Sequence, residues 1–314
     1  MTLGIIDVGT NSIHLLVGIA GFNGRFRVLR KERYLTRLGE GGLASGALTR
    51  PAMRRAMKVL RRFAATLKRL GVDRVEAVAT SAVRETSNGQ KFLRQVRRRL
   101  GIPLRIISGR EEARLIYLGV LQARRLRRPA VIVAIGGGSA QVALGDGMRL
   151  RYATSVLLGG ARLAQQFIRH DPARSREVVA LSRAVRRAWT PVVQALRRHR
   201  WRQALGSSAT IEQLMTAAHL RRHRRLPEGR RRLSITRAQL GELVAWLASS
   251  TAKQRIQLPG LDPRRQDLAL TTGVTLLVWM EACGISRLSY ASGSIREGLV
   301  MDLLSPSKFR YTYR

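Results

Sequence analysis

The pattern of apolar and polar positions predicts a strand hairpin at the start of the chain. Apolar residues 3–6 and 13–19 enclose a short loop over residues 7–12, which carries a glycine. Two short apolar runs joined by a tight loop are typical of adjacent buried strands. A third strand is expected over residues 26–34.

The same pattern recurs in the middle of the chain. Apolar residues 131–133 and 142–144 enclose a second loop over residues 134–139, which contains three consecutive glycines. Glycine has no side chain, so backbone N–H groups in such loops can approach an anion closely. We therefore expect both loops to be phosphate-binding turns between buried strands.

Helical patterns lie between the strands. The clearest helix follows Thr49, which can cap it; Pro51 stands in its first turn, an apolar stripe covers residues 53–67, and Gly71 ends it. Two basic stretches are expected to be irregular, an exposed loop at 221–232 and a frayed tail at 305–314. Further strands are expected at 75–79, 104–107, 151–156, 203–205 and 287–291, and further helices end near 100 or cover 110–122, 162–167, 175–198, 237–249, 266–283 and 295–304.

The order of these elements indicates a duplicated domain. The series strand-strand-strand-helix-strand-helix-strand-helix restarts at Val131, after a basic linker over residues 124–129. A repeated order of this kind implies a repeated structural unit. We expect an α/β protein with an N-terminal domain over residues 1–125 and a C-terminal domain over residues 126–314. Each would be a mixed sheet flanked by helices, with a cleft between the two.

Composition excludes several classes of protein. The chain has 314 residues, of which 45% are hydrophobic, enough for two folded domains. Cys283 is the only cysteine, so neither an intrachain disulfide nor a cysteine zinc cluster can form. Asp7, Asn11 and His14 interrupt the apolar N-terminal run, which argues against a targeting or membrane segment. We expect a cytoplasmic protein without a membrane partner.

The formal net charge of +39 has two explanations, a polyanionic partner or a genomic bias towards arginine. It arises from 58 lysines and arginines against 19 acids. A field of this strength attracts polyanions over long distances, and arginine binds phosphate oxygens in pairs. Polyphosphate, a multiply phosphorylated nucleotide and nucleic acid all carry the required charge. Both explanations stay open at this point.

The first glycine loop carries the groups that phosphoryl transfer requires, which are donors around the phosphates and an acid. Asp7 is its only acid. Gly9, Thr10, Asn11 and Ser12 would donate hydrogen bonds to phosphate oxygens from their backbone, hydroxyl and amide groups. Asp7 could instead serve only as a turn residue, but its place between two apolar strands favours a functional role.

The second glycine loop offers donors without an acid. The backbone N–H groups of Gly136, Gly137 and Gly138 and the hydroxyl of Ser139 would bind phosphate, whereas the position equivalent to Asp7 is alanine. The two loops therefore differ in charge, and any proposal for function has to account for that difference.

Two further places hold candidate polar groups. Glu111 and Glu112 begin the helix expected at 110–122, and Glu112 is the better candidate for a base that activates water. Acids are favoured at a helix N-terminus in any case, so the residues alone favour a structural role for both acids, as charges that complement the helix dipole. Ser81 and Arg84 follow a strand end; Arg84 would either bind phosphate with Ser81 or pair with Glu85.

Five strings of residues resemble the exopolyphosphatase and guanosine pentaphosphate phosphatase family. Their order and spacing match across essentially the whole chain, and together they are highly specific, although a single glycine loop would be a weak signal. They are residues 7–12 (DVGTNS), 79–85 (ATSAVRE), 107–119 (ISGREEARLIYLG), 135–139 (IGGGS) and 296–298 (REG).

The resemblance implies a fold, a reaction and roles for two acids. It implies two ribonuclease-H-like domains of the actin, sugar-kinase and heat-shock ATPase superfamily, with the active site in the cleft between them. Glu112 would position the attacking water, and Asp7 would hold Mg²⁺ or the water. The implied substrate is inorganic polyphosphate or guanosine pentaphosphate. We expect no specific nucleic-acid partner, because no recognised reading motif is present, and a homodimer is an open expectation.

The second loop departs from the family pattern, which normally reads Asp-x-Gly-Gly-Gly-Ser-Thr-Glu. Ala134, Ala140 and Gln141 replace the first acid, the threonine and the last acid. The resemblance implies that the two missing acids act with a divalent metal and the water. Losing them lowers repulsion towards a polyanion and weakens metal-assisted catalysis. Two functions stay open, an exopolyphosphatase and a catalytically impaired polyphosphate-binding or regulatory protein on the same fold.

Overall fold

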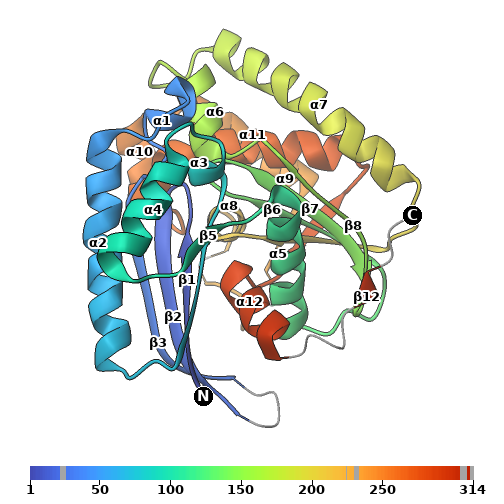
Figure 1. Ribbon diagram of the computed structural model, residues 1–314. Coiled ribbons are helices and arrows are strands. Elements are labelled where there is room, and N and C mark those ends of the chain that lie inside the picture. The colour runs from blue at the N-terminus through green and yellow to red at the C-terminus, as the bar shows by residue number, and fades with distance from the viewer. Residues whose placement is uncertain (22–25, 224, 230–232, 305–309, 312–314) are drawn as a thin grey trace.

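Two β-sheets with helices around and between them form the described part of the chain (Figure 1). The computed structural model describes residues 1–21, 26–223, 225–229, 233–304 and 310–311. The first sheet has the order β3-β2-β1-β4-β5, in which β1 is antiparallel to β2 and parallel to β4. The predicted first hairpin is therefore confirmed. The strands are β1 (Thr2–Val8), β2 (Ser12–Ala20), β3 (Phe26–Leu35), β4 (Arg74–Ala79) and β5 (Leu104–Ile106).

The second sheet repeats the topology of the first and adds a strand at each edge. Its order is β10-β11-β9-β6-β7-β8-β12, and the five central strands correspond to β5, β4, β1, β2 and β3 through their pairing. The predicted duplication is confirmed. The strands are β6 (Ala130–Ile135), β7 (Ala140–Asp146), β8 (Arg149–Val156), β9 (Gln203–Ser207), β10 (Ser234–Thr236), β11 (Arg287–Tyr290) and β12 (Arg310–Tyr311).

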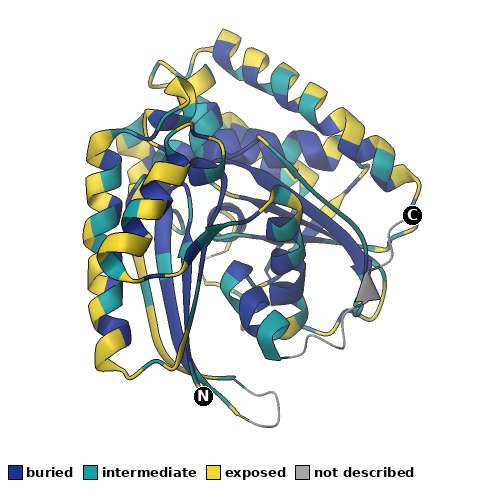
Figure 2. Cartoon of the chain, viewed as in Figure 1, coloured by how far each residue is buried: buried dark blue, intermediate teal, exposed yellow. Residues whose placement is uncertain are grey.

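Both faces of β1 and β2 in the first sheet are buried, which explains their continuous apolar runs. Ile6 in β1 belongs to the core that includes helices α2 (Arg50–Arg69) and α4 (Gly89–Leu100). Ile5, the residue before it, faces the opposite side of the sheet. It belongs to the core that includes helices α5 (Gly109–Ala123) and α12 (Ile295–Leu304). Figure 2 shows the central strands of both sheets as largely buried and the edge strand β3 as largely exposed.

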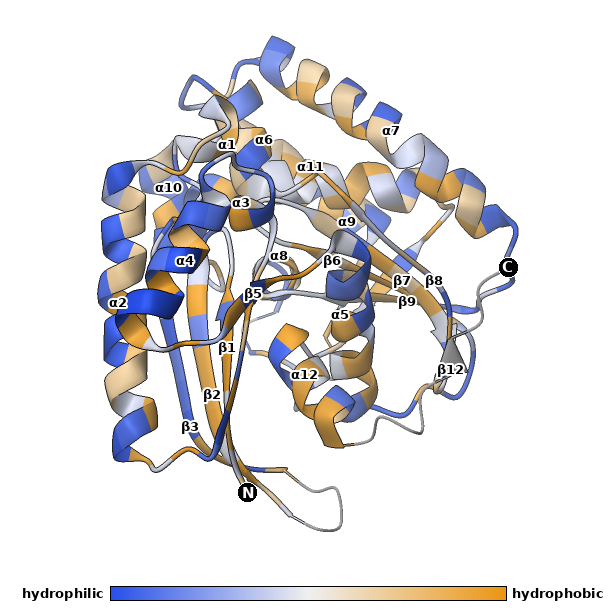
Figure 3. Cartoon of the chain, viewed as in Figure 1, coloured by the Kyte–Doolittle hydropathy of each residue, from blue (hydrophilic) through white to orange (hydrophobic). Residues whose placement is uncertain are grey.

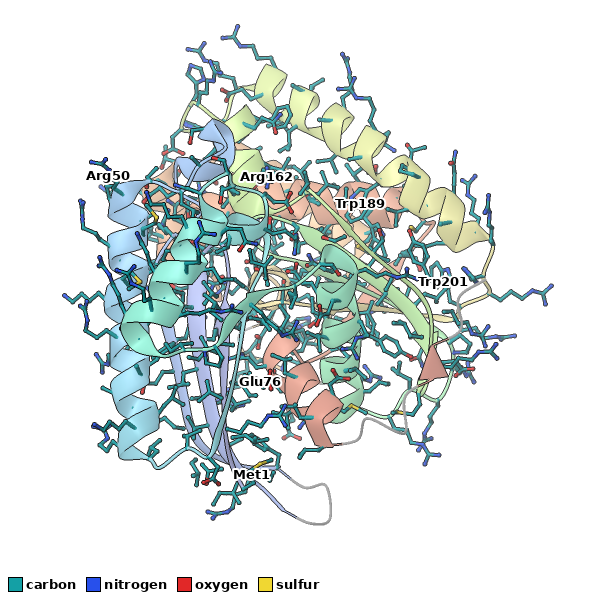
Figure 4. All side chains as sticks on the ribbon, in the orientation of Figure 1. Met1, Arg50, Glu76, Arg162, Trp189 and Trp201 are labelled. Atoms are coloured by element: carbon teal, nitrogen blue, oxygen red, sulfur yellow. The ribbon has the colours of Figure 1, made fainter. Side chains whose placement is uncertain are left out.

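Helix α2 forms as its sequence predicts. The hydroxyl of Thr49 accepts a hydrogen bond from the N–H of Ala52, which caps the first turn. The apolar stripe packs inwards and includes Phe63, which is fully buried. Arg50 points out into solvent (Figure 4), and hydrophilic positions alternate with apolar ones along the helix (Figure 3). The first half also contains two short helices, α1 (Gly42–Ser45) and α3 (Ser81–Arg84).

Helices α5 (Gly109–Ala123) and α12 (Ile295–Leu304) lie side by side between the two sheets (Figure 1). Two glycines allow their close contact. A Cβ at Gly298 would lie 1.9 Å from the carbonyl oxygen of Leu115, and a Cβ at Gly119 would lie 2.3 Å from that of Ser294. Although α5 precedes the predicted boundary at residue 125, it packs on β7 and β8 of the second sheet. The boundary itself stays a prediction.

The remaining helices cover the second sheet. Trp189 on α7 packs against Trp279 on α11 with ring centroids 6.5 Å apart, and its indole N–H donates to the carbonyl of Thr275. No helix in the described ranges combines the length and apolar character that crossing a membrane requires. The helices are α6 (Gly160–Phe167), α7 (Ser175–Arg197), α8 (Ala209–Leu220), α9 (Arg237–Ser249), α10 (Ala252–Ile256), the 3₁₀ turn η2 (Pro263–Arg265) and α11 (Gln266–Ala282).

The sequence expectations missed five elements of the second half, which are α8, β10, α10, η2 and β12. Helix α8 has little amphipathic pattern because it is buried on several sides, and β10 and α10 are too short to show a period. Within the tail that was expected to be frayed, β12 pairs in parallel with β8. Residues 305–309 and 312–314 of that tail, and 224 and 230–232 of the basic loop, lie outside the described residues.

Candidate functional site

Both glycine loops line one cavity of about 210 Å³ between the two sheets. The loops join the central hairpin of each sheet, so the duplication places them in equivalent positions. In the β1–β2 hairpin Asp7 stands opposite His14, and in the β6–β7 hairpin Ala134 stands opposite Gln141. The predicted site residues Asp7, Gly9, Thr10, Asn11, Ser12, Glu112, Gly136, Gly137, Gly138 and Ser139 all line this cavity.

The two loops have the same turn and touch each other. The N–H of Gly9 donates to the carbonyl of Ser12 at 3.0 Å, and the N–H of Gly136 donates to that of Ser139 at 2.9 Å. A Cβ at Gly138 would lie 2.5 Å from Ser81 Oγ and within similar reach of the first loop. Glycine is therefore required where the second loop crosses the first.

Asp7 is the next-to-last residue of β1 and lines the cavity with an unpaired carboxylate oxygen. Its Oδ1 is buried and has no hydrogen-bond partner among the described residues. Burial raises the pKa of Asp7 to about 6, and the positive charge of Arg296 opposes that rise. The side chain can thus exchange a proton close to neutral pH.

Glu112 lies in the first turn of α5, where Ser108 caps the helix by accepting from the N–H of Glu111. Its side chain is buried, and Arg84 Nη1 donates to Glu112 Oε2 at 2.9 Å. Burial raises the pKa of Glu112 to about 7, while the charge and hydrogen bond of Arg84 hold it down. A carboxyl group with this pKa can accept a proton from water at neutral pH.

Ser81 and Arg84 were predicted to bind phosphate, but neither lines the cavity. Arg84 donates to Glu85, to Glu112 and to the carbonyl of Ile107, each at 2.9 Å. Its guanidinium is therefore already hydrogen-bonded to protein groups. Of the two predicted roles, the geometry favours pairing with Glu85. The hydroxyl of Ser81 is buried beneath the second loop.

Sequence reasoning missed Arg265 and Arg296 as cavity residues. Arg265 is 6% exposed, and its Nη2 donates to Ser12 Oγ at 2.7 Å. Its Nε is buried without a partner, and burial lowers its pKa to about 10, so it stays charged at neutral pH. Arg296 donates to Ser294 at the start of α12. Arg296 stands in one of the matching strings, whereas no local pattern marks Arg265.

Contacts between the two halves of the molecule hold Arg265 in place. Arg37 donates to Asp267 at 2.6 Å and to the carbonyl of Arg264 at 3.0 Å, and Arg33 pairs with Asp262 at 3.5 Å. Both pairs join the β3 end of the first sheet to the segment around η2. Arg265 thus enters the cavity from the second half and meets the first loop.

A family model decides the family of the chain. The model for the Ppx/GppA phosphatase family matches residues 19–306. The chain belongs to the Ppx/GppA phosphatase family. Its structure is similar to that of an exopolyphosphatase from Cytophaga hutchinsonii, with 28% identity, a TM-score of 0.89 and coverage of 99% of this chain and 100% of that one. An Aquifex aeolicus family member shares 23% identity at a TM-score of 0.79, over 98% and 99% of the two chains.

These comparisons confirm the predicted fold class for this Ppx/GppA protein. Two mixed sheets with flanking helices match an actin-like ATPase fold with two domains over nearly the full length of both chains. The family also supports phosphatase chemistry on phosphoanhydride substrates. The cavity between the glycine loops is the candidate site for such chemistry.

Several other polar groups face this cavity in the family member described here. His14 lines it with a buried Nδ1 that has no partner, and burial together with nearby arginines lowers its pKa well below the usual value. The N-terminus of α8 also lines the cavity, and Ser208 there has a φ of 114°, a strained value for a residue with a side chain. Buried polar atoms normally have partners, so the unpaired Nδ1 of His14 is available to a polar ligand or to water.

The donor set does not fit a resident Mg²⁺ ion. Among the described residues, no group of three or more histidines, cysteines or acids is placed to hold a metal. Asp7 is the one acid of the two loops, Glu112 is paired with Arg84, and Ala134 and Gln141 stand where the family pattern has acids. Mg²⁺ at Asp7 stays a prediction.

Proposed function

We propose that this protein is an exopolyphosphatase-type phosphohydrolase that releases terminal phosphate from inorganic polyphosphate. The observation that carries the proposal is Glu112, a buried carboxyl group with a pKa of about 7 in a cavity lined by two phosphate-binding loops. The similarity to the Cytophaga hutchinsonii exopolyphosphatase supports the same substrate class. Guanosine pentaphosphate is a second proposed substrate, because it offers the same terminal phosphoanhydride.

The proposed mechanism uses groups that the cavity brings together. The N–H groups and hydroxyls of the two loops would hold the terminal phosphate, and Arg265 and Arg296 would face its negative charge. Glu112 would take a proton from water as the water oxygen bonds to the terminal phosphorus. The bond from that phosphorus to the bridging oxygen breaks, and the shortened chain leaves with its new terminal oxygen.

A catalytically impaired polyphosphate-binding protein is the second candidate function. Ala134 and Gln141 favour it, because they remove two carboxylates and leave the donors of the second loop in place. The two candidates agree on the ligand and differ in turnover.

Phosphate release from long-chain polyphosphate separates the two candidates. The wild type is compared with Glu112→Gln and with Glu111→Gln, a matched control because Glu111 pairs with Arg105 at 2.8 Å and does not line the cavity. Loss of a general base costs roughly 10²–10⁴-fold in rate. Turnover that Glu112→Gln removes and Glu111→Gln retains supports the hydrolase. A wild type that binds polyphosphate but releases no phosphate supports the second candidate.

Two predictions about partners need separate measurements. A nucleic-acid function fails if salt removes DNA of equal charge far more readily than it removes polyphosphate. Light scattering measures the oligomeric state and so tests the predicted homodimer. The cytoplasmic location also stays a prediction.

A further inference from the structure

The charged groups of the cavity differ in whether they have a partner of opposite charge. Its acids are Asp7 and Glu112, and its arginines are Arg265 and Arg296. Glu112 is already paired with Arg84 behind the cavity wall. In contrast, neither cavity arginine has a carboxylate within ion-pair distance in the described part of the chain.

Arg265 is the more informative of the two arginines. A buried guanidinium without an acidic partner is costly, because desolvation is not repaid by an opposite charge. The ion pairs Arg37–Asp267 and Arg33–Asp262 fix the segment that carries Arg265. The guanidinium therefore stays buried and does not reach bulk water while these pairs are formed. Its unpaired Nε would gain a partner from an anion in the cavity.

The second loop also presents donors only. Gln141 Nε2 donates to Ser139 Oγ at 2.7 Å and to Ser155 Oγ at 3.1 Å. Because the Ser139 oxygen accepts this bond, its own O–H is free to donate into the cavity. A glutamate at position 141 would instead accept from both serines and add a negative charge beside the phosphate.

We propose that this cleft binds the phosphate chain without a divalent cation, with Arg265 and Arg296 supplying the positive charge. Guanidinium groups neutralise phosphoryl oxygens directly and bind them in pairs. Ala134 and Gln141 act in the same direction as the two arginines. Because they remove negative charge from the cavity, they favour binding of a phosphate chain that carries no metal ion. The inference rests on the proposed phosphate-chain ligand and does not depend on turnover.

The test is calorimetric titration with inorganic tripolyphosphate, a short probe that limits binding to the basic outer surface. The wild type is titrated with excess magnesium and with excess EDTA. We expect affinity in EDTA to equal or exceed that in magnesium, because the uncomplexed anion carries more charge. Affinity that EDTA abolishes would overturn the proposal.

Substitution of the arginines tests the same point independently. Arg265→Gln and Arg296→Gln should each weaken binding in EDTA by roughly tenfold or more, the size expected for a charged hydrogen bond. Arg264→Gln is the matched control, because it removes the same charge from a neighbouring exposed side chain. Thermal unfolding checks that each variant folds. Equal binding by Arg264→Gln and both cavity variants would refute the role of the cavity arginines.

Restoring the family acids should create a metal requirement. The double variant Ala134→Asp with Gln141→Glu should bind tripolyphosphate weakly in EDTA and regain affinity with magnesium. If its binding remains independent of magnesium, the proposed exchange of acids for arginines is wrong. Binding in EDTA without phosphate release would refute the hydrolase alone, whereas turnover in magnesium together with binding that EDTA abolishes would refute this inference alone.

Discussion

Removing Arg84 should raise the pKa of Glu112 and move the pH dependence of the reaction. Burial raises this pKa from 4.5 to about 7, and the charge and the 2.9 Å hydrogen bond of Arg84 are the two largest effects that oppose it. In Arg84→Gln the burial remains and most of the opposition is lost. The proton is then held to higher pH, so the base form is scarcer at neutral pH.

The size of this effect follows from the contact that is lost. A hydrogen bond to a charged group contributes about 1.5–3 kcal/mol, which corresponds to a rise of about one to two pKa units. At pH 7 the fraction of Glu112 in its base form would fall roughly 5- to 50-fold. The same variant should recover much of its rate about two pH units higher.

The assay is the pH dependence of phosphate release at saturating polyphosphate. The acidic limb of the profile should lie near pH 7 for the wild type and shift upwards in Arg84→Gln. Arg84→Lys keeps the charge and should shift less. Arg105→Gln, which breaks the comparable pair with Glu111, should leave the limb in place. A loss of rate that is equal at every pH would refute the reasoning, because Arg84 would then act only on structure.

Three further predictions concern stability and packing. Asp7→Asn should stabilise the protein by up to about 3 kcal/mol at pH 8, because burial raises the pKa of Asp7 from 3.8 to about 6 in the folded protein. This gain in stability should vanish as the pH falls through 6 to below 3.8. Equal unfolding temperatures of the variant and the wild type at pH 8 would contradict the prediction. Gly138→Ala should abolish tripolyphosphate binding by forcing the loops apart, whereas Gly241→Ala, which meets open space in α9, should bind normally in the same titration. Gly298→Ala should lower the thermal unfolding temperature by several degrees, since its Cβ would overlap the backbone of α5, and an unchanged transition would count against the close helix contact.

The sequence could predict the two hairpin loops because their signal is local. Each loop needs only two apolar runs and a glycine turn, and the pairing of β1 with β2 and of β6 with β7 follows from chain proximity. The helix start that carries Glu112 is also local, since Ser108 caps the helix one turn or less before the expected start at residue 110. These parts of the cavity therefore come from short stretches of sequence.

The role of Arg84 and the presence of Arg265 depend on contacts between distant segments. Arg84 reaches Glu112 across 28 positions, and Arg265 reaches Ser12 across 253. In a chain with 58 basic residues, no local pattern separates these two arginines from those that face solvent. Burial and pairing distinguish them, and both appear only in the folded structure.

The packing of α12 between the sheets has a consequence for the order in which the chain matures. Helix α12 contacts β1 and α5, which were synthesised almost three hundred and almost two hundred positions earlier. While a ribosome is still making the second half, the apolar side of α5 has no α12 to cover it, and Arg296 has not yet been added. The first loop therefore exists in the nascent chain long before the cavity is complete, and newly made protein should acquire affinity for polyphosphate only after α12 has been made.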